Sequence, residues 1–144
     1  MKIAFFVTPK QQVVWVSLDA RVNQALEQME KHRHSAVPLL DPDGGYAGTL
    51  TEGDLLWHLR NADAPWHEVA DVTPLQSVAR RMDNQPVHID AEIETLIARA
   101  VDQSFVPVVD DRNVFVGIVR RKRIIEYCAE RAGLLNVETT PTAN

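Results

Sequence analysis

The sequence has a single cysteine, Cys128, and no run of about 18 apolar residues. One cysteine excludes an internal disulfide and a zinc site built on cysteines. The apolar N-terminus is broken by Thr8, Pro9 and Lys10 before it reaches the length of a secretory signal. A net charge of −5 gives no bulk attraction to nucleic acids or anionic membranes. These absences predict a cytoplasmic protein that binds neither nucleic acid nor membrane.

The motifs of common catalytic and metal sites are also missing. There is no G-x-S-x-G turn and no Cys–His arrangement typical of a nucleophile. His32 and His34 are too close in sequence to share one helical face, and no acidic cluster accompanies them. Residues 41–45 are a hairpin turn rather than a phosphate loop, because no Lys-Ser/Thr pair follows. The sequence therefore predicts a non-enzymatic chain without a metal site.

What the chain does contain is a repeat. Three segments recur in the same order, 69 to 71 positions later. The matching pairs are 16–22 with 87–93, 35–41 with 104–110, and 48–56 with 117–125. A repeat of this length is a structural unit that need not bury its apolar face alone. Two copies can pair, and their pairing leaves clefts between them.

Both copies predict the same element pattern, β-α-β-β-α. Pro38 places its strand at a sheet edge or at a strand start. Between the copies, apolar residues over 69–78 lie at helical spacing. The expected elements of the first copy are strands over 13–18, 36–40 and 46–50, and helices from Asp19 and from Thr51 or Glu52. Those of the second copy are strands over 86–89, 106–109 and 114–119, and helices from Asp90 and Arg121.

The first copy carries the pattern Gly48-x-x-Thr51-x-x-Asp54 at the start of a helix. A helix N-terminus offers free backbone N–H groups and a positive dipole end, which suit phosphate. The Asp54 carboxylate, one turn in, can accept two hydrogen bonds from a ribose diol. The alternative is local, since Thr51 can cap the helix and Asp54 can complement its dipole. The motif alone leaves both interpretations open.

The second copy breaks this pattern, because Arg120 and Arg123 stand where Thr51 and Asp54 stood. Four consecutive basic residues, 120–123, oppose the helix dipole unless they meet anions. One interpretation is a solvated run paired with Glu126 or Glu130, and the other is a phosphate clamp. Binding of nucleic acid through the run is opposed by the acidic net charge.

Several motifs together resemble those of a CBS domain, and the second copy resembles another. They are Thr8-Pro9 before a strand, Asp19-Ala20 opening a helix, Val37-Pro38-Leu39-Leu40-Asp41, and Gly48-x-x-Thr51-x-x-Asp54. The likeness covers residues 5–128, so the chain resembles a stand-alone CBS pair, or Bateman module. The resemblance implies an α/β (α+β) fold with two tandem β-α-β-β-α units packed as a pseudo-two-fold pair. Its expected divisions are unit 1 with an N-terminal segment over 1–61, a linker with a helix over 62–77, unit 2 over 78–132, and a flexible tail over 133–144.

The resemblance also implies adenine nucleotides or related adenosine compounds as ligands, bound in two clefts between the repeats. In the first cleft, Asp54 is expected to hold the ribose and Thr51 a phosphate oxygen. Lys122 is expected to reach across to phosphate. The opposite wall is expected to comprise Gln85, Pro86, Val87, Ser104, Phe105 and Val106.

The second cleft departs from the family pattern, since Arg120 and Arg123 replace its phosphate and ribose residues. Either Arg123 fills this cleft and leaves it empty, or the arginines select a ligand with more negative charge. The other residues expected to line it are Val13, Val14, Trp15, Ser35, Ala36 and Val37.

A closer resemblance is to small bacterial CBS-pair proteins that bind cyclic di-AMP. It rests on the pair-only layout, the compact C-terminal helix and the segments 35–42 and 115–121. In those proteins, a backbone near the position of Val14 and a hydroxyl at that of Ser35 act with two adjacent arginines, here Arg120 and Arg121. Cyclic di-AMP and AMP, ADP or ATP remain alternative ligands. The resemblance implies a regulatory homodimer that signals to a protein partner by ligand-dependent conformational change, with a ligand-free dimerisation module as the alternative.

Overall fold

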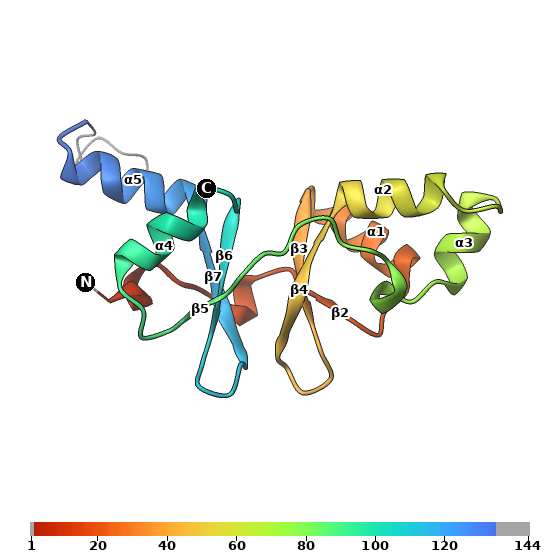
Figure 1. Ribbon diagram of the computed structural model, residues 1–144, viewed down its shortest axis with the longest axis horizontal. Coiled ribbons are helices and arrows are strands. Elements are labelled where there is room, and N and C mark those ends of the chain that lie inside the picture. The colour runs from red at the N-terminus through yellow and green to blue at the C-terminus, as the bar shows by residue number, and fades with distance from the viewer. Residues whose placement is uncertain (1, 135–144) are drawn as a thin grey trace.

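The computed structural model describes residues 2–134 and has the predicted mixed α+β architecture (Figure 1). The predicted flexible tail, apart from its first two residues, lies outside the described residues. No helix within residues 2–134 combines the length and apolar character needed to cross a bilayer. The first half contains the 3-10 turn η1 (Ile3–Phe6), β1 (Thr8–Pro9), η2 (Lys10–Gln12), β2 (Val16–Ser17), α1 (Val22–His32), β3 (Ala36–Leu40), β4 (Tyr46–Thr51) and α2 (Glu52–Arg60). The second half contains α3 (Trp66–Val72), η3 (Leu75–Ser77), β5 (Val87–His88), α4 (Ile93–Ala100), β6 (Phe105–Val109), β7 (Phe115–Arg120) and α5 (Arg121–Arg131).

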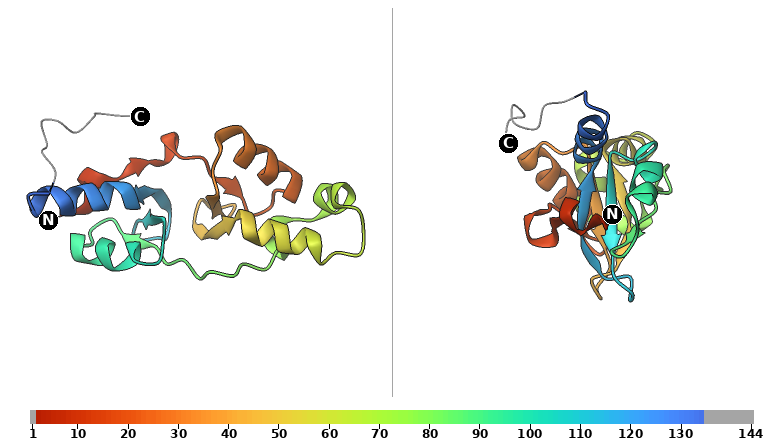
Figure 2. Two further views of the ribbon diagram at one scale, coloured as in Figure 1. Left: turned by 90° about the horizontal axis from the view of Figure 1, so that it is seen from above. Right: turned by 90° about the vertical axis from the view of Figure 1, so that its left-hand side faces the viewer.

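Each repeat contributes one sheet, and the two sheets lie side by side at the centre with the helices outside them (Figures 1 and 2). The strand orders are β2-β3-β4 and β1-β7-β6-β5. In both repeats the first strand runs parallel to the second, and the second antiparallel to the third. The register shifts after Leu39 in one sheet and after Val108 in the other, at positions related by the repeat. The sequence repeat therefore extends to the details of strand pairing.

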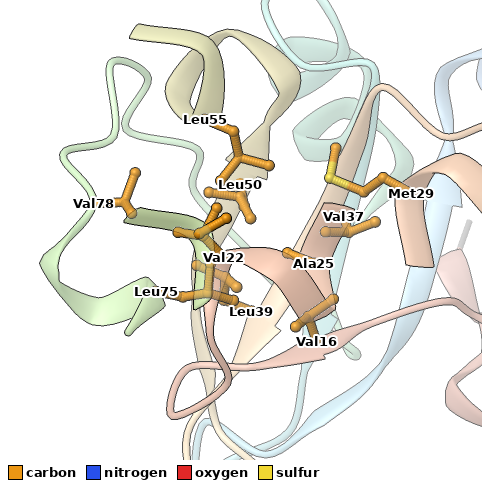
Figure 3. Close-up of a cluster of buried hydrophobic side chains, with 11 residues drawn as sticks. Val16, Val22, Ala25, Met29, Val37, Leu39, Leu50, Leu55, Leu75 and Val78 are labelled. Carbon is orange, nitrogen blue, oxygen red and sulfur yellow. The ribbon is translucent and has the colours of Figure 1, made fainter. Parts of the chain in front are cut away.

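The segment that precedes each repeat packs onto the other repeat. Leu75 and Val78, which precede the second repeat, are buried in the core of the first (Figure 3). Ile3 and Phe6, which precede the first repeat, are buried in the core of the second. β1 also pairs with β7, so the N-terminal segment grouped with unit 1 by sequence lies in the sheet of unit 2. Burying such side chains gives roughly 1.5–3 kcal/mol each, which ties the two repeats together.

The two hairpin turns exchange equivalent hydrogen bonds. The Tyr46 N–H donates to the Asn113 carbonyl at 3.2 Å, and the Phe115 N–H donates to the Gly44 carbonyl at 2.9 Å. Gly44 and Asn113 are related by the repeat, and both have positive φ, at 83° and 63°. The rings of Tyr46 and Phe115 share one buried cluster that draws residues from both repeats. This exchange confirms the predicted pseudo-two-fold pairing.

Local boundaries differ from the sequence prediction at the start of each repeat. The strand expected over 13–18 is limited to Val16–Ser17, and that expected over 86–89 is limited to Val87–His88. Asp19 does not cap the first helix, which begins at Val22. Asp90 likewise lies before α4, which begins at Ile93. A tight turn between strand and helix takes up these residues in both repeats.

Two prolines decide the remaining differences. The helical pattern over 69–78 is divided into α3 and η3 because Pro74 has no N–H to donate and cannot continue a helix. Pro38 lies in β3, the central strand of its sheet, where the sequence predicted a sheet edge or a strand start. The proline is tolerated because β2 pairs only with Leu39 and Leu40, so within residues 2–134 no strand adjoins Pro38 on that side.

Gly117 allows the close approach of the N-terminal segment to β7. A Cβ atom at this position would overlap the Thr8 carbonyl oxygen and lie 2.8 Å from a Val7 methyl carbon. We therefore expect Gly117→Ala to displace β1 and to lower the free energy of unfolding by about 1–3 kcal/mol. Urea denaturation measures the effect. Gly53→Ala is the matched control, because its Cβ would meet nothing nearer than 3.7 Å and a helical alanine is favourable. Equal unfolding midpoints for the two variants would contradict this account of β1.

Candidate functional site

Thr51 and Asp54 form a reciprocal cap at the start of α2. Thr51 is the last residue of β4, and its hydroxyl oxygen accepts the Asp54 N–H at 3.1 Å. The Asp54 carboxylate returns the interaction by accepting the Thr51 N–H at 2.9 Å. The local interpretation of the motif is therefore realised. Any ligand that uses these two side chains must share them with the helix cap.

Asp54 also joins the first repeat to residues 78–86, which connect η3 to β5. These residues are called the linker from here on, although the division expected from the sequence placed them in unit 2. Its second carboxylate oxygen accepts the Arg81 N–H at 3.0 Å, and the residue is only 3% exposed. The Arg81 guanidinium lies over the Trp57 ring at 5.1 Å from the centroid. The neighbouring Arg80 side chain lies against Gly48, at the beginning of the same motif. Sequence analysis missed both linker arginines, because no motif marks them.

The expected opposite wall lies at the edge of the second repeat. The side chain of Gln103 accepts the Gln85 N–H at 2.8 Å and donates to the Gln85 carbonyl at 3.1 Å. Gln103 is buried, which fixes the chain just before β5. The Ser104 carbonyl accepts the Arg121 N–H at 2.9 Å. Among the predicted wall residues, Gln85 and Ser104 are exposed, Pro86 is half-buried, and Val87, Phe105 and Val106 are buried.

Tyr46 connects the two sides of the expected first cleft. Its hydroxyl lies 2.6 Å from the Thr49 hydroxyl and donates to the Asn84 carbonyl at 3.3 Å. Burial raises the pKa of Tyr46 to about 12. Asn84 directly precedes Gln85, and Phe105 belongs to the same buried cluster as Tyr46. The structure thus brings the first repeat, the linker and the predicted wall together, through a tyrosine that sequence analysis did not select.

The residues of the expected second cleft repeat this backbone plan with other side chains. The Ser35 carbonyl accepts the Glu52 N–H at 2.9 Å, which matches the contact made by Ser104. Ser35 is exposed, Ala36 is half-buried and Val37 is buried. Val13 and Ala36 contact the cluster shared by the repeats, whereas Val14 packs on the core of the first repeat. Trp15 is 39% exposed, with the Lys10 ammonium 5.1 Å from its ring centroid.

Arg120 acts electrostatically on the first repeat. Burial lowers the pKa of His34, and the charges of Arg120 and His32 lower it further. Arg120 belongs to the second repeat and is exposed, whereas His34 directly precedes Ser35 in the first. The charge of Arg120 is therefore felt across the boundary between the repeats, next to Ser35 in sequence.

The other basic residues of the run point elsewhere. The Arg121 side chain donates to the carbonyls of Ala100 at 2.9 Å and Gln103 at 3.1 Å, so it caps the end of α4. The Arg123 guanidinium lies 5.3 Å from the centroid of the Phe6 ring, and Lys122 is exposed. Within residues 2–134, none of the run 120–123 forms an ion pair with either glutamate of α5.

His88, Asp90 and Asp111 form a cluster that the sequence did not indicate. The Nδ1 atom of His88 accepts the Asp90 N–H at 3.0 Å. A neutral His88 then carries its proton on Nε2, which faces the Asp111 carboxylate at 2.5 Å. Both ring nitrogens are engaged inside the cluster, so the arrangement fits a hydrogen-bonded turn better than cation binding.

Comparison with known proteins identifies the repeat. A family model described as the CBS domain matches residues 6–61 and again residues 69–130. The chain belongs to the CBS domain family. A CBS domain protein from Streptococcus pneumoniae has a similar structure, with a TM-score of 0.79 and 26% identity over 92% of this chain and 88% of that one. CbpB from Listeria monocytogenes, solved in complex with c-di-AMP, has a TM-score of 0.79 and 22% identity over 92% of this chain and 98% of that one.

One curated relative sets the CBS pair in a different context. Inosine-5'-monophosphate dehydrogenase from Methanocaldococcus jannaschii is 27% identical over 114 residues, which is 79% of this chain. The chain spans only 21% of the length of that relative. The likeness therefore concerns the CBS pair, not the activity of the dehydrogenase.

The raised pKa of Tyr46 predicts a specific loss of stability in alkali. The unfolded chain releases this proton near the ordinary tyrosine pKa of 10.0, whereas the folded chain holds it to about 12. The contribution is complete below about pH 10 and is lost as the pH rises towards 12, amounting to about 2–3 kcal/mol. Urea denaturation between pH 8 and 11 should show wild-type stability falling relative to Tyr46→Phe. Parallel curves for the two proteins would contradict the assignment.

Proposed function

We propose that this CBS pair is a non-enzymatic regulatory protein that binds adenine nucleotides in the two clefts between its repeats. The observation that supports it most directly is the meeting of both repeats and the linker around Thr51, Asp54 and Tyr46. A ligand in such a cleft contacts parts that can move relative to one another. It can therefore bias the protein between two conformations through its different affinity for each. A protein partner would read that change.

The two clefts favour different ligands. Asp54 offers a carboxylate that can bind a free ribose diol, as in AMP, ADP or ATP. The second cleft has no carboxylate at the position of Asp54, since Arg123 stands there with its guanidinium over Phe6, and the charge of Arg120 acts on His34 next to Ser35. Cyclic di-AMP suits the second cleft, because its phosphodiesters are anionic and each 3'-oxygen is already esterified. The structural likeness to CbpB in complex with c-di-AMP makes it the first ligand to test.

The alternative function is a dimerisation module that binds no small molecule. A groove of about 1010 Å³ with apolar and charged lining residues runs between α1, α2 and α3, and a mainly apolar one of about 480 Å³ runs between α4 and α5. Leu56 and Ile125, related by the repeat, are 57% and 58% exposed on the helices α2 and α5, which lie on the same side of the molecule (Figure 1). Exposed apolar patches of this kind mark interaction surfaces. We propose a homodimer through this face in either case.

Isothermal titration with AMP, ATP and cyclic di-AMP tests the assignment of ligands to clefts. Asp54→Ala should weaken AMP binding by about 1.5–3 kcal/mol, the range for hydrogen bonds to a charged group. It should affect cyclic di-AMP less, since that ligand has no free diol. Arg120→Ala should weaken cyclic di-AMP binding more than AMP binding. Arg112→Ala, in an exposed turn, is the control for loss of one positive charge.

Two outcomes of this titration would contradict the proposal. No binding of AMP, ATP or cyclic di-AMP at millimolar concentration would leave the dimerisation module as the function. Equal losses for both ligands in both variants would argue against two clefts with different ligands.

The proposed homodimer face makes a separate prediction. Leu56→Asp with Ile125→Asp should convert a dimer to a monomer, because two charges would be buried in an apolar contact. Light scattering after size exclusion measures the mass. Phe5→Asp is the control, as Phe5 is 83% exposed and belongs to η1 rather than to α2 or α5. A wild-type protein that is already monomeric at high concentration would exclude the face as a dimer contact.

A further inference from the structure

The linker residues 79–84, here called the strap, cross the first cleft without helix or strand structure. Four contacts hold the strap on the first repeat. The Arg81 N–H donates to Asp54, the Arg81 guanidinium lies over Trp57, and the Asn84 carbonyl accepts the Tyr46 hydroxyl. The fourth is the Arg80 side chain, which lies against Gly48. Each contact is a single hydrogen bond or the packing of one side chain, so the strap belongs to the part of the fold that opens most easily.

The segment equivalent to the strap, on the second repeat, is held more strongly. Ile3 and Phe6 occupy the places of Leu75 and Val78, which aligns Thr8 with Arg80 and Pro9 with Arg81. Thr8 and Pro9 form the strand β1, paired with Ile118 and Gly117 of β7. Within the described residues, the strap forms no such strand with β4. The first cleft therefore has the weaker cover of the two.

Asp54 is inaccessible while the strap is in place. The residue is 3% exposed, and each carboxylate oxygen accepts one backbone N–H. The bond from Thr51 belongs to the cap of α2, and its loss would cost helix stability. The bond from Arg81 belongs to an irregular segment. Of the two bonds, the one from Arg81 is therefore the one that can break to admit a ligand hydroxyl.

We propose that the strap is operated by the ligand: a nucleotide whose ribose hydroxyls bind Asp54 displaces the Arg81 N–H and releases residues 79–84. This inference rests on the proposed nucleotide binding in the first cleft. The strap continues into Gln85 and β5, so its release alters the connection to the second repeat. The free energy for this release comes from the hydrogen bonds between the ribose and the Asp54 carboxylate. These bonds can form only when the strap is released, so the ligand favours the released state. Coupling of this kind is reciprocal, so a partner that holds the strap closed would weaken nucleotide binding.

Hydrogen exchange on the wild-type protein tests the release without any substitution. Saturating AMP should speed amide exchange over residues 79–86, whereas a ligand that merely packs on a fixed strap should slow it. Slower or unchanged exchange in this segment, with AMP bound, would overturn the inference while leaving nucleotide binding intact. If AMP does not bind at all, the proposed use of the first cleft and the ligand-operated strap both fail.

A pair of substitutions at one position isolates the backbone bond. Arg81→Pro removes both the N–H and the guanidinium, and Pro9 occupies the equivalent place in the second repeat. Arg81→Ala removes the guanidinium but keeps the N–H. Arg81→Pro should bind AMP roughly tenfold more tightly than Arg81→Ala, because the binding-competent state no longer competes with a hydrogen bond to a carboxylate. Equal AMP affinities of the two folded variants would overturn the inference.

Discussion

The structure depends on the hydrogen bonds that the two hairpin turns exchange, from Tyr46 to Asn113 and from Phe115 to Gly44. They fix the two sheets in one relative register and bring both aromatic rings into a cluster that neither repeat could bury alone. The Asp41 and Asp110 carboxylates shape the turns by accepting two backbone N–H groups each. The hydrogen bonds from the Arg112 and Val114 N–H groups are the main cause of the lowered pKa of Asp110. Both proposed clefts lie between the repeats, so the positions of their walls depend on this contact.

The first cleft concentrates structural and binding roles on one side chain. Asp54 caps α2, accepts the linker N–H and is the group proposed to receive a ribose. A buried carboxylate needs hydrogen-bond donors in every state, because leaving it unpaired costs far more than leaving a neutral group unpaired. Exchange of one donor for another is therefore the only inexpensive change open to it. This makes Asp54 suited to couple a ligand to the position of the chain.

The order of elements, which depends on the repeat and on local propensities, could be predicted from the sequence. Contacts between segments that are distant in the sequence could not. The order of elements follows from the recurrence of 35–41 in 104–110 and from apolar periodicity, and the family assignment from the same motifs. It could not show that Arg121 caps α4, because that depends on how the C-terminal end of α4 meets the start of α5. The contact of Asp54 with Arg81 was equally hidden, since it spans 27 positions and involves a backbone N–H that every residue but proline has. The exchange of preceding segments could have been found, because Ile3 and Phe6 match Leu75 and Val78 in spacing and in apolar character.

The departures from symmetry in the two clefts are chemically linked. Where the first repeat has a carboxylate at position 54 and an N–H at position 81, the second has a guanidinium at Arg123 and no N–H at Pro9. Because the Arg123 guanidinium lies over Phe6 and arginine offers no acceptor, an N–H at position 9 would have no carboxylate partner and would carry the cost of an unpaired donor. Proline removes that donor, and pairing of its neighbour Thr8 in β1 holds the segment instead. The loss of the carboxylate and the gain of the proline are thus one consistent change. It leaves the second cleft with a fixed cover and positive charge, and the first with a releasable cover and a buried acid.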